Sequence, residues 1–222
     1  MSGTVASQVL RSGLLEGASV LVVAADPPTA GASSLALASA AACAELGAKV
    51  SLCPLTPAVD DSGIEAALEL ALGEMGTAQL LVVDAAALFA GGDPGAEARP
   101  GPEADCERGG AALRHCLELT WSATRAVFDR AFLPGAGGRV IYLAPALGAG
   151  EHAAAARAGL ENLARTLSVE WARHAVTTVA IAPSDGSSPA EVAALVAYLA
   201  SPAGSYFSGC LLDLAAQAPA AA

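Results

Sequence analysis

Short apolar runs alternate with longer alanine-rich segments along most of the chain. The apolar runs are bounded by glycine or proline, as in 19–24, which follows Gly17, and 177–182, which precedes Pro183. Continuous apolar runs of this kind are typical of strands that are covered on both faces of a parallel sheet. The runs predict strands at 19–24, 49–53, 80–83, 139–143, 177–182 and 209–214.

The segments between these strands have the composition of helices. The segment 33–46, for example, is rich in alanine and ends at Gly47, and glycine commonly terminates a helix. Because parallel strands need a crossover between them, this repetition predicts an α/β fold. We expect a single Rossmann-like, doubly wound parallel sheet of about six or seven strands with helices on both faces. The predicted helices are 33–46, 64–73, 113–132, 153–173 and 190–200.

The whole chain, 1–222, is expected to form one domain, since this length suffices for one sizeable core. The stretch 90–110 is rich in glycine, proline and charge, and predicts a surface loop because strands and helices resume after it. The two ends, 1–16 and 215–222, are expected to be poorly ordered.

Composition narrows the function classes. The net charge of −11, with Lys and Arg numbering only 11, disfavours nucleic acid and anionic membranes as partners. No apolar run reaches the roughly 18 residues of a membrane span, and the N-terminus lacks the pattern of a secretion signal. The five cysteines show no Cys-x-x-Cys spacing, which favours free thiols over disulfides or a metal site. We therefore expect a cytoplasmic protein without metal.

Several segments of the second half match one family in the right order. They are the strand 138–143 (GRVIYL), the helix 156–172 (ARAGLENLARTLSVEWA), the strand and proline 179–183 (VAIAP), and the C-terminal segment 198–214. With these segments the chain resembles the short-chain dehydrogenase/reductase family over nearly its full length. The resemblance implies the scaffold of a nucleotide-dependent oxidoreductase, in which a Tyr-x-x-x-Lys pair and a serine act on the substrate.

The positions of that catalytic set hold other residues here. In the family the tyrosine transfers the proton, the lysine lowers the tyrosine pKa and holds the ribose, and the serine polarises the carbonyl. The resemblance places the serine at Pro145 or its neighbour Ala144, the tyrosine at Ala153 and the lysine at Arg157. Proline and alanine carry no hydroxyl, and arginine does not titrate in the useful range. The single lysine of the chain, Lys49, lies elsewhere. We therefore expect no standard catalytic residue.

The cofactor motif is also altered. The family has Thr-Gly-x-x-x-Gly-x-Gly after its first strand, where backbone N–H groups meet the pyrophosphate. Here only Gly31 remains, with Ser33 as a helix cap that can bind a small anion, and Asp26 adds a repelling carboxylate. Asp84, at the family's Asn-Asn-Ala-Gly, is expected to keep a structural hydrogen bond. We expect no tightly bound NAD or NADP; Gly31, Ser33, Asp84 and Arg157 are the positions that would contact one.

Two other side chains have alternative interpretations. His152 precedes the tyrosine position and titrates in a useful range, so it is a candidate substitute acid. The other interpretation is a loop or helix-cap histidine beside Glu151. Tyr142 is interpreted as a packing residue, because strand alternation points it into the sheet packing.

Three functions remain open. The first is a non-catalytic subunit that pairs with itself or with an intact relative through helices 113–132 and 153–173 and the C-terminal strand. The second is an active NAD- or NADP-dependent oxidoreductase that uses His152 or a water molecule as acid and Arg157 as ribose clamp. The third is a small-ligand sensor that uses the crevice at the carboxyl ends of the strands.

Overall fold

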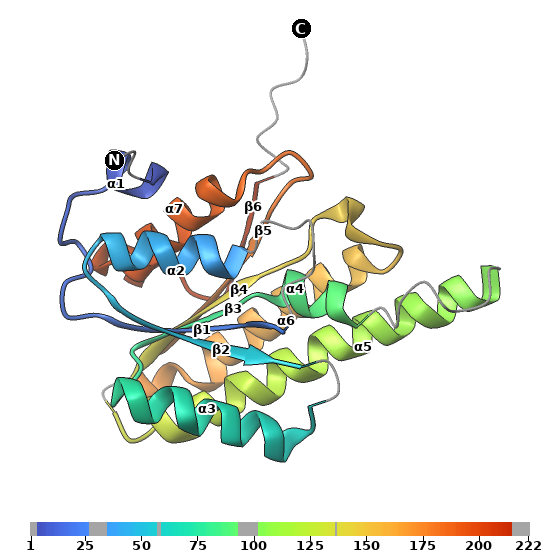
Figure 1. Cartoon of the computed structure of the whole chain (residues 1–222), viewed down its shortest axis with the longest axis horizontal. Helices are drawn as coiled ribbons and strands as arrows, with labels where there is room; N and C mark the ends of the chain where they lie inside the picture. Colours follow the sequence, from blue (N-terminus) through green and yellow to red (C-terminus); the bar gives the residue numbers. More distant parts are fainter. Residues whose placement is uncertain (1–3, 27–34, 57–58, 93–101, 136, 215–222) are drawn as a thin grey trace, which may run out of the picture.

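A six-stranded parallel sheet forms the centre of the molecule (Figure 1). The computed structural model describes residues 4–26, 35–56, 59–92, 102–135 and 137–214. The strand order is β2-β1-β3-β4-β5-β6, and every neighbouring pair is parallel. The predicted α/β class and parallel sheet are thus confirmed. The strands are β1 (Ser19–Ala25), β2 (Lys49–Leu55), β3 (Leu80–Val83), β4 (Gly138–Leu143), β5 (Val176–Ala182) and β6 (Cys210–Asp213).

Helices cover both faces of this sheet and create two hydrophobic cores. In Figure 1 the helices α1, α2 and α7 lie above the sheet, and α3, α5 and α6 lie below it. Successive side chains of a strand point to opposite faces, so Val20 and Val22 join the first core while Leu21 and Val23 join the second. The helices are α1 (Val5–Val9), α2 (Leu35–Glu45), α3 (Asp61–Met75), α4 (Ala85–Gly91), α5 (Pro102–Val127), α6 (Ala153–Glu170) and α7 (Pro189–Ala200).

The prediction of a surface loop at 90–110 is wrong over 102–110, because α5 begins at Pro102. Proline is favourable in the first turn of a helix, where its missing N–H needs no partner. The apolar period that predicts a helix starts only at Ala112, which with Cys116 and Leu119 is buried against the sheet. The first part of α5 therefore has a loop-like composition. At its other end the helix widens into one π-helical turn, Phe128–Phe132.

The prediction of a poorly ordered N-terminal segment is also wrong over residues 4–16. Thr4 caps α1, and the Glu45 carboxylate at the end of α2 accepts hydrogen bonds from Thr4 N (3.1 Å) and Thr4 Oγ1 (2.7 Å). Leu15 is 2% exposed and its N–H donates to Leu46 O at 2.9 Å. These contacts hold the segment against the face that carries α2 and α7. The C-terminal residues 215–222 lie outside the described residues.

The second long helix, α6, ends at Glu170 rather than at the predicted residue 173. A 3-10 turn, Ala172–His174, follows it. Trp171 stacks on Phe128 with ring centroids 4.0 Å apart, which joins the end of α6 to the π-helical turn after α5. In the described part of the chain, no helix is long and apolar enough to cross a membrane.

Candidate functional site

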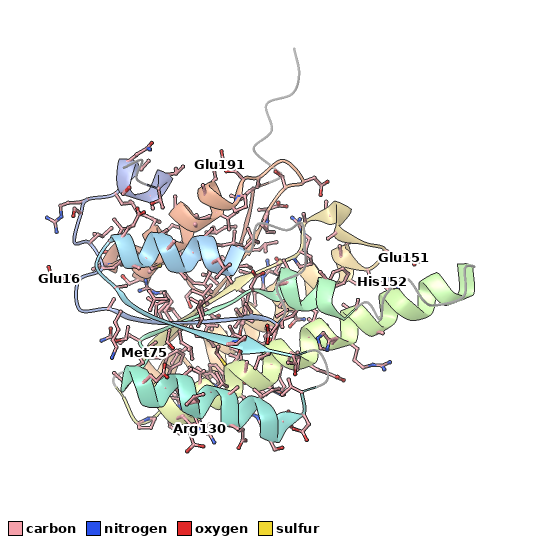
Figure 2. All side chains as sticks on the ribbon, in the orientation of Figure 1. Glu16, Met75, Arg130, Glu151, His152 and Glu191 are labelled. Carbon is pink, nitrogen blue, oxygen red and sulfur yellow. The ribbon has the colours of Figure 1, made fainter. Side chains whose placement is uncertain are left out.

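The carboxyl ends of the strands form the edge of the sheet where this architecture places ligands. The strand order reverses next to β1, since β2 lies on one side of it and β3 on the other. This reversal defines a switch point between β1 and β3, with Asp84 directly after β3. Figure 2 shows Glu151 and His152 at this end of the molecule, at the right of the view.

Asp84 joins the starts of two helices at the switch point. Its Oδ1 accepts a hydrogen bond from Ala87 N at 3.0 Å and so caps α4. Its Oδ2 accepts a hydrogen bond from Ala36 N, in the first turn of α2, at 2.8 Å. The first turn of a helix after β1 is where a Rossmann-like fold binds pyrophosphate. An internal carboxylate therefore takes part of the role that a phosphate has in that position, and the expected structural hydrogen bond of Asp84 is confirmed.

Burial determines the electrostatics around Asp84, which is 1% exposed. Desolvation raises the pKa of its carboxyl, and the two backbone N–H groups oppose that rise. The neighbouring Cys116 donates its thiol to Ala85 O at 3.2 Å. Desolvation is the main cause that raises the pKa of this thiol to about 12. Cys116 is accordingly a neutral packing residue and not a nucleophile.

Arg157, at the family's lysine position, is bound within the protein. It is 6% exposed. Its Nη2 donates to Asp213 Oδ1 at 2.9 Å, and its Nη1 donates to Pro183 O at 3.0 Å. The guanidinium thus ties α6 to the ends of β5 and β6. A ribose clamp at this position would have to share these donors.

Apolar groups occupy the positions of the family's tyrosine and serine. Ala153 and Ala144 are both 0% exposed, and Pro145 is buried. A Cβ atom added to Gly150 would lie 3.3 Å from Cε1 of Phe89, so the aromatic ring of α4 packs against the loop that precedes α6. The same loop also contacts the loop that follows β5, because Gly148 N donates a hydrogen bond to Asp185 Oδ1 at 2.8 Å. The described surroundings of Ala153 are therefore packed with protein atoms.

The substitute acid His152 and the packing residue Tyr142 differ in their surroundings. His152 is half-buried at the N-cap of α6, but its side chain makes no capping hydrogen bond. Tyr142 is fully buried in the core, as predicted, and its hydroxyl has no hydrogen-bond partner within the described residues. Burial raises the pKa of Tyr142 above its ordinary value. A buried phenol of this kind is poorly suited to proton transfer near neutral pH.

The hollow at the carboxyl ends of β1 and β2 is small. It has a volume of about 130 Å³ and is lined by apolar side chains, among them Leu37 and Leu52, together with Asp26. Ligand sites usually measure about 300–1,000 Å³. Gly31 and Ser33 lie outside the described residues. At this edge Asp84 accepts a hydrogen bond from the start of α2, and Arg157 donates one to Asp213.

Metal chemistry finds no support in the described part of the chain, where no group of three or more His, Cys, Asp or Glu side chains gathers. No protein-family model matches the sequence, and no curated protein matches it.

A short-chain dehydrogenase from Mycobacterium smegmatis is 24% identical, with 94% of this chain and 95% of that chain covered and a TM-score of 0.73. A hydroxysteroid dehydrogenase from Escherichia coli is 17% identical, with 91% and 97% covered and a TM-score of 0.68. A short-chain dehydrogenase/reductase from Serratia marcescens is 18% identical, with 90% and 97% covered and a TM-score of 0.65. This chain has the short-chain dehydrogenase fold.

Within that fold, sequence reasoning missed two features of the site. It did not predict α4, although Asp84 before an apolar run and the two glycines after it form a recognisable capped helix. It also left Arg157 without a partner, because Asp213 lies 56 residues further along the chain. No local spacing rule connects two residues that meet only through a parallel sheet.

Proposed function

We propose that this chain is a non-catalytic subunit of the short-chain dehydrogenase fold, which assembles with a second copy of itself or with an intact relative. One observation carries the proposal: the two ionisable side chains at the cofactor edge, Asp84 and Arg157, are both engaged in internal hydrogen bonds. To bind at the start of α2 or at the guanidinium of Arg157, a dinucleotide would have to break a buried hydrogen bond. The lack of a hydroxyl at Ala153 supports the same conclusion.

The outer surface of α5 and α6 supports assembly. The two helices pack closely, because a Cβ atom added to Gly159 would lie 2.9 Å from Cδ2 of Leu117. Trp121 on α5 is 40% exposed and Val169 on α6 is 76% exposed, so large apolar side chains face solvent from both helices. Exposed alanines on α6, such as Ala158, allow a partner helix to approach closely. Aromatic side chains of this kind commonly contribute most of the energy of an interface.

Titration with NADH and NADPH tests the non-catalytic part of the proposal. We expect no saturable change in cofactor fluorescence, because the described cofactor edge is filled by protein groups. An intact short-chain dehydrogenase measured under the same conditions is the positive control. Submillimolar affinity for either cofactor would contradict the proposal and would favour an active enzyme with His152 as acid.

Replacement of Trp121 by glutamate tests the assembly surface. A charge at this site should weaken pairing by at least about 2 kcal/mol, since truncated aromatic anchors cost that much or more. Light scattering after size-exclusion chromatography is expected to show the wild-type chain as an oligomer and the Trp121→Glu chain shifted toward the monomer. Val169→Glu should act in the same direction.

The matched control is Val9→Glu, because Val9 is 74% exposed on α1, on the opposite face of the sheet. It should leave the mass unchanged. If the wild-type chain is a monomer alone, the measurement is repeated after co-expression with an intact short-chain dehydrogenase of the same organism. A chain that stays monomeric in both settings would rule the proposal out.

A further inference from the structure

A second hollow lies at the opposite edge of the sheet, at the amino ends of the strands. Its volume is about 540 Å³, well above that of the hollow at the carboxyl ends. Figure 2 marks this end of the molecule, at the left of the view, with Glu16 and with Met75 at the end of α3. The lining combines apolar side chains (Val20, Leu80, Ala131) with polar ones (Thr77, Gln79, Arg139). Its size lies in the range of small-molecule sites, which is about 300–1,000 Å³.

Arg139 places a cation in this hollow, and one nitrogen of its guanidinium has no hydrogen-bond partner among the described residues. It is the second residue of β4 and is half-buried. Its Nε donates to Thr177 Oγ1 at 3.3 Å, and its Nη1 donates to Leu199 O and to Ser201 O, at the end of α7. These bonds fix the plane of the guanidinium. Its Nη2 has no hydrogen-bond partner in the described part of the chain.

Arg139 forms no ion pair with a carboxylate of the described residues; its acceptors at the end of α7 are backbone carbonyls. The ion pairs between described residues involve other arginines. Burial lowers the pKa of Arg139 from its ordinary value, and no carboxylate counters that effect. A partly desolvated cation without a counter-ion among the described residues has an electrostatic preference for an anion, although the net charge of −11 opposes the approach of one.

Gln79 adds a second donor on the same wall. The backbone N–H of Ser19 donates to Gln79 Oε1 at 3.2 Å, which assigns the amide orientation. The Nε2 amide group is therefore left as a donor, and Gln79 lines the hollow together with Arg139. Two donors beside an apolar floor match a carboxylate that is attached to an apolar body.

Glu16 is the one acidic side chain among the described residues that line this hollow or the hollow beside it. It lines a smaller adjoining hollow that also contains Arg139 and Gln79. It is exposed and forms no ion pair with Arg139. Its charge therefore lowers the affinity for an anion but leaves Nη2 accessible.

From this geometry we propose that the hollow at the amino ends of the strands is a binding site for a small organic carboxylate, held by Arg139 and Gln79. The site is separate from the carboxyl-end crevice and does not depend on the proposed function. It assigns a ligand class to a surface on which the short-chain dehydrogenase resemblance places no role.

Isothermal titration with benzoate tests the site, and benzamide is the uncharged control of the same shape. We expect saturable binding of benzoate and binding of benzamide that is at least about tenfold weaker, a difference of about 1.4 kcal/mol. Binding of benzoate should also raise the unfolding temperature of the protein. Equal binding of both probes, or no saturable binding of benzoate at concentrations up to about 10 mM, the range of a 2.7 kcal/mol interaction, overturns the proposal.

Two variants locate the binding. Arg139→Leu should abolish it but also removes the hydrogen bonds to Leu199 O and Ser201 O, so a second variant is needed. Gln79→Glu keeps the acceptor for Ser19 N and puts a carboxylate beside Arg139, so it should weaken benzoate at least about tenfold without unfolding the chain. Glu16→Gln should leave the affinity equal or higher. Unchanged binding in Gln79→Glu, or weaker binding in Glu16→Gln, contradicts the assignment.

Discussion

Replacement of Asp84 by alanine is expected to lower the free energy of unfolding by about 3 kcal/mol. The variant loses the cap of α4 and leaves the N–H of Ala36 without an acceptor in a buried environment. A lost cap costs about 0.5–2 kcal/mol, and a buried unsatisfied donor about 1–3 kcal/mol. Thermal unfolding should show a decrease of roughly 6–12 °C for a chain of this size.

The matched control is Asp60→Ala. Asp60 also caps a helix, since its Oδ1 accepts from Gly63 N at 2.9 Å, but it is exposed and serves only α3. It should destabilise the protein clearly less than Asp84→Ala. An equal decrease in the free energy of unfolding in the two variants would show that the second contact of Asp84, to α2, does not contribute to stability.

The pH dependence of an Asp84→Asn variant separates the charge from the hydrogen bonds. Burial raises the pKa of Asp84 in the folded protein. Its contribution is therefore fully present below the unfolded pKa of about 3.9 and decreases as the pH rises through the folded pKa. The stability advantage of wild type over Asp84→Asn should be larger in acid than at neutral pH. The opposite trend would mean that the two N–H groups outweigh desolvation.

Replacement of Arg157 by methionine is expected to cost about 2 kcal/mol, measured by chemical unfolding. Removal of one partner of a buried ion pair typically costs about 3–5 kcal/mol. The value is lower here because the side chain of Asp213 is 41% exposed and can be solvated after the change. Methionine retains the apolar stem, so the loss reports on the contacts to Asp213 and to Pro183 O.

Arg165→Met on the same helix is the control for this experiment. Arg165 pairs with Glu161 one turn away, and its side chain is 66% exposed, so the change should have little effect. Arg157→Lys should be intermediate, since a lysine reaches one acceptor and cannot bridge two as the planar guanidinium does. A negligible cost of Arg157→Met would remove the structural explanation for arginine at this position.

The alternation of apolar runs was sufficient to predict the sheet. The predicted strand at 80–83 coincides with β3, and the others differ from the observed bounds by a few residues at most. The signal is strongest in the central strands β1, β3, β4 and β5, because most of their residues are buried and few are polar. Helix starts were less predictable: the polar first turns of α5 lie before its buried face begins, and α1 is held by a contact with the distant Glu45.

The candidate site was predictable in its residue types but not in its contacts. Sequence reasoning located Asp84, Ala153 and Arg157, because the resemblance aligns them with family positions. The partners of Asp84 and Arg157 come from other elements, namely the start of α2 and the end of β6. Such contacts depend on the strand order, which local patterns do not specify. The hollow beside Arg139 escaped notice for the same reason, since its walls come from several strand ends and loops.

The position of Asp84 has a consequence for how this protein responds to its surroundings. A helix start that is stabilised by a dissociable phosphate ligand gains stability only in proportion to the logarithm of ligand concentration. Here the carboxylate that meets the N–H of Ala36 is part of the chain and never dissociates. The stability that this contact confers therefore does not depend on the concentration of a metabolite. The contact does not couple the lifetime of the protein to metabolite supply.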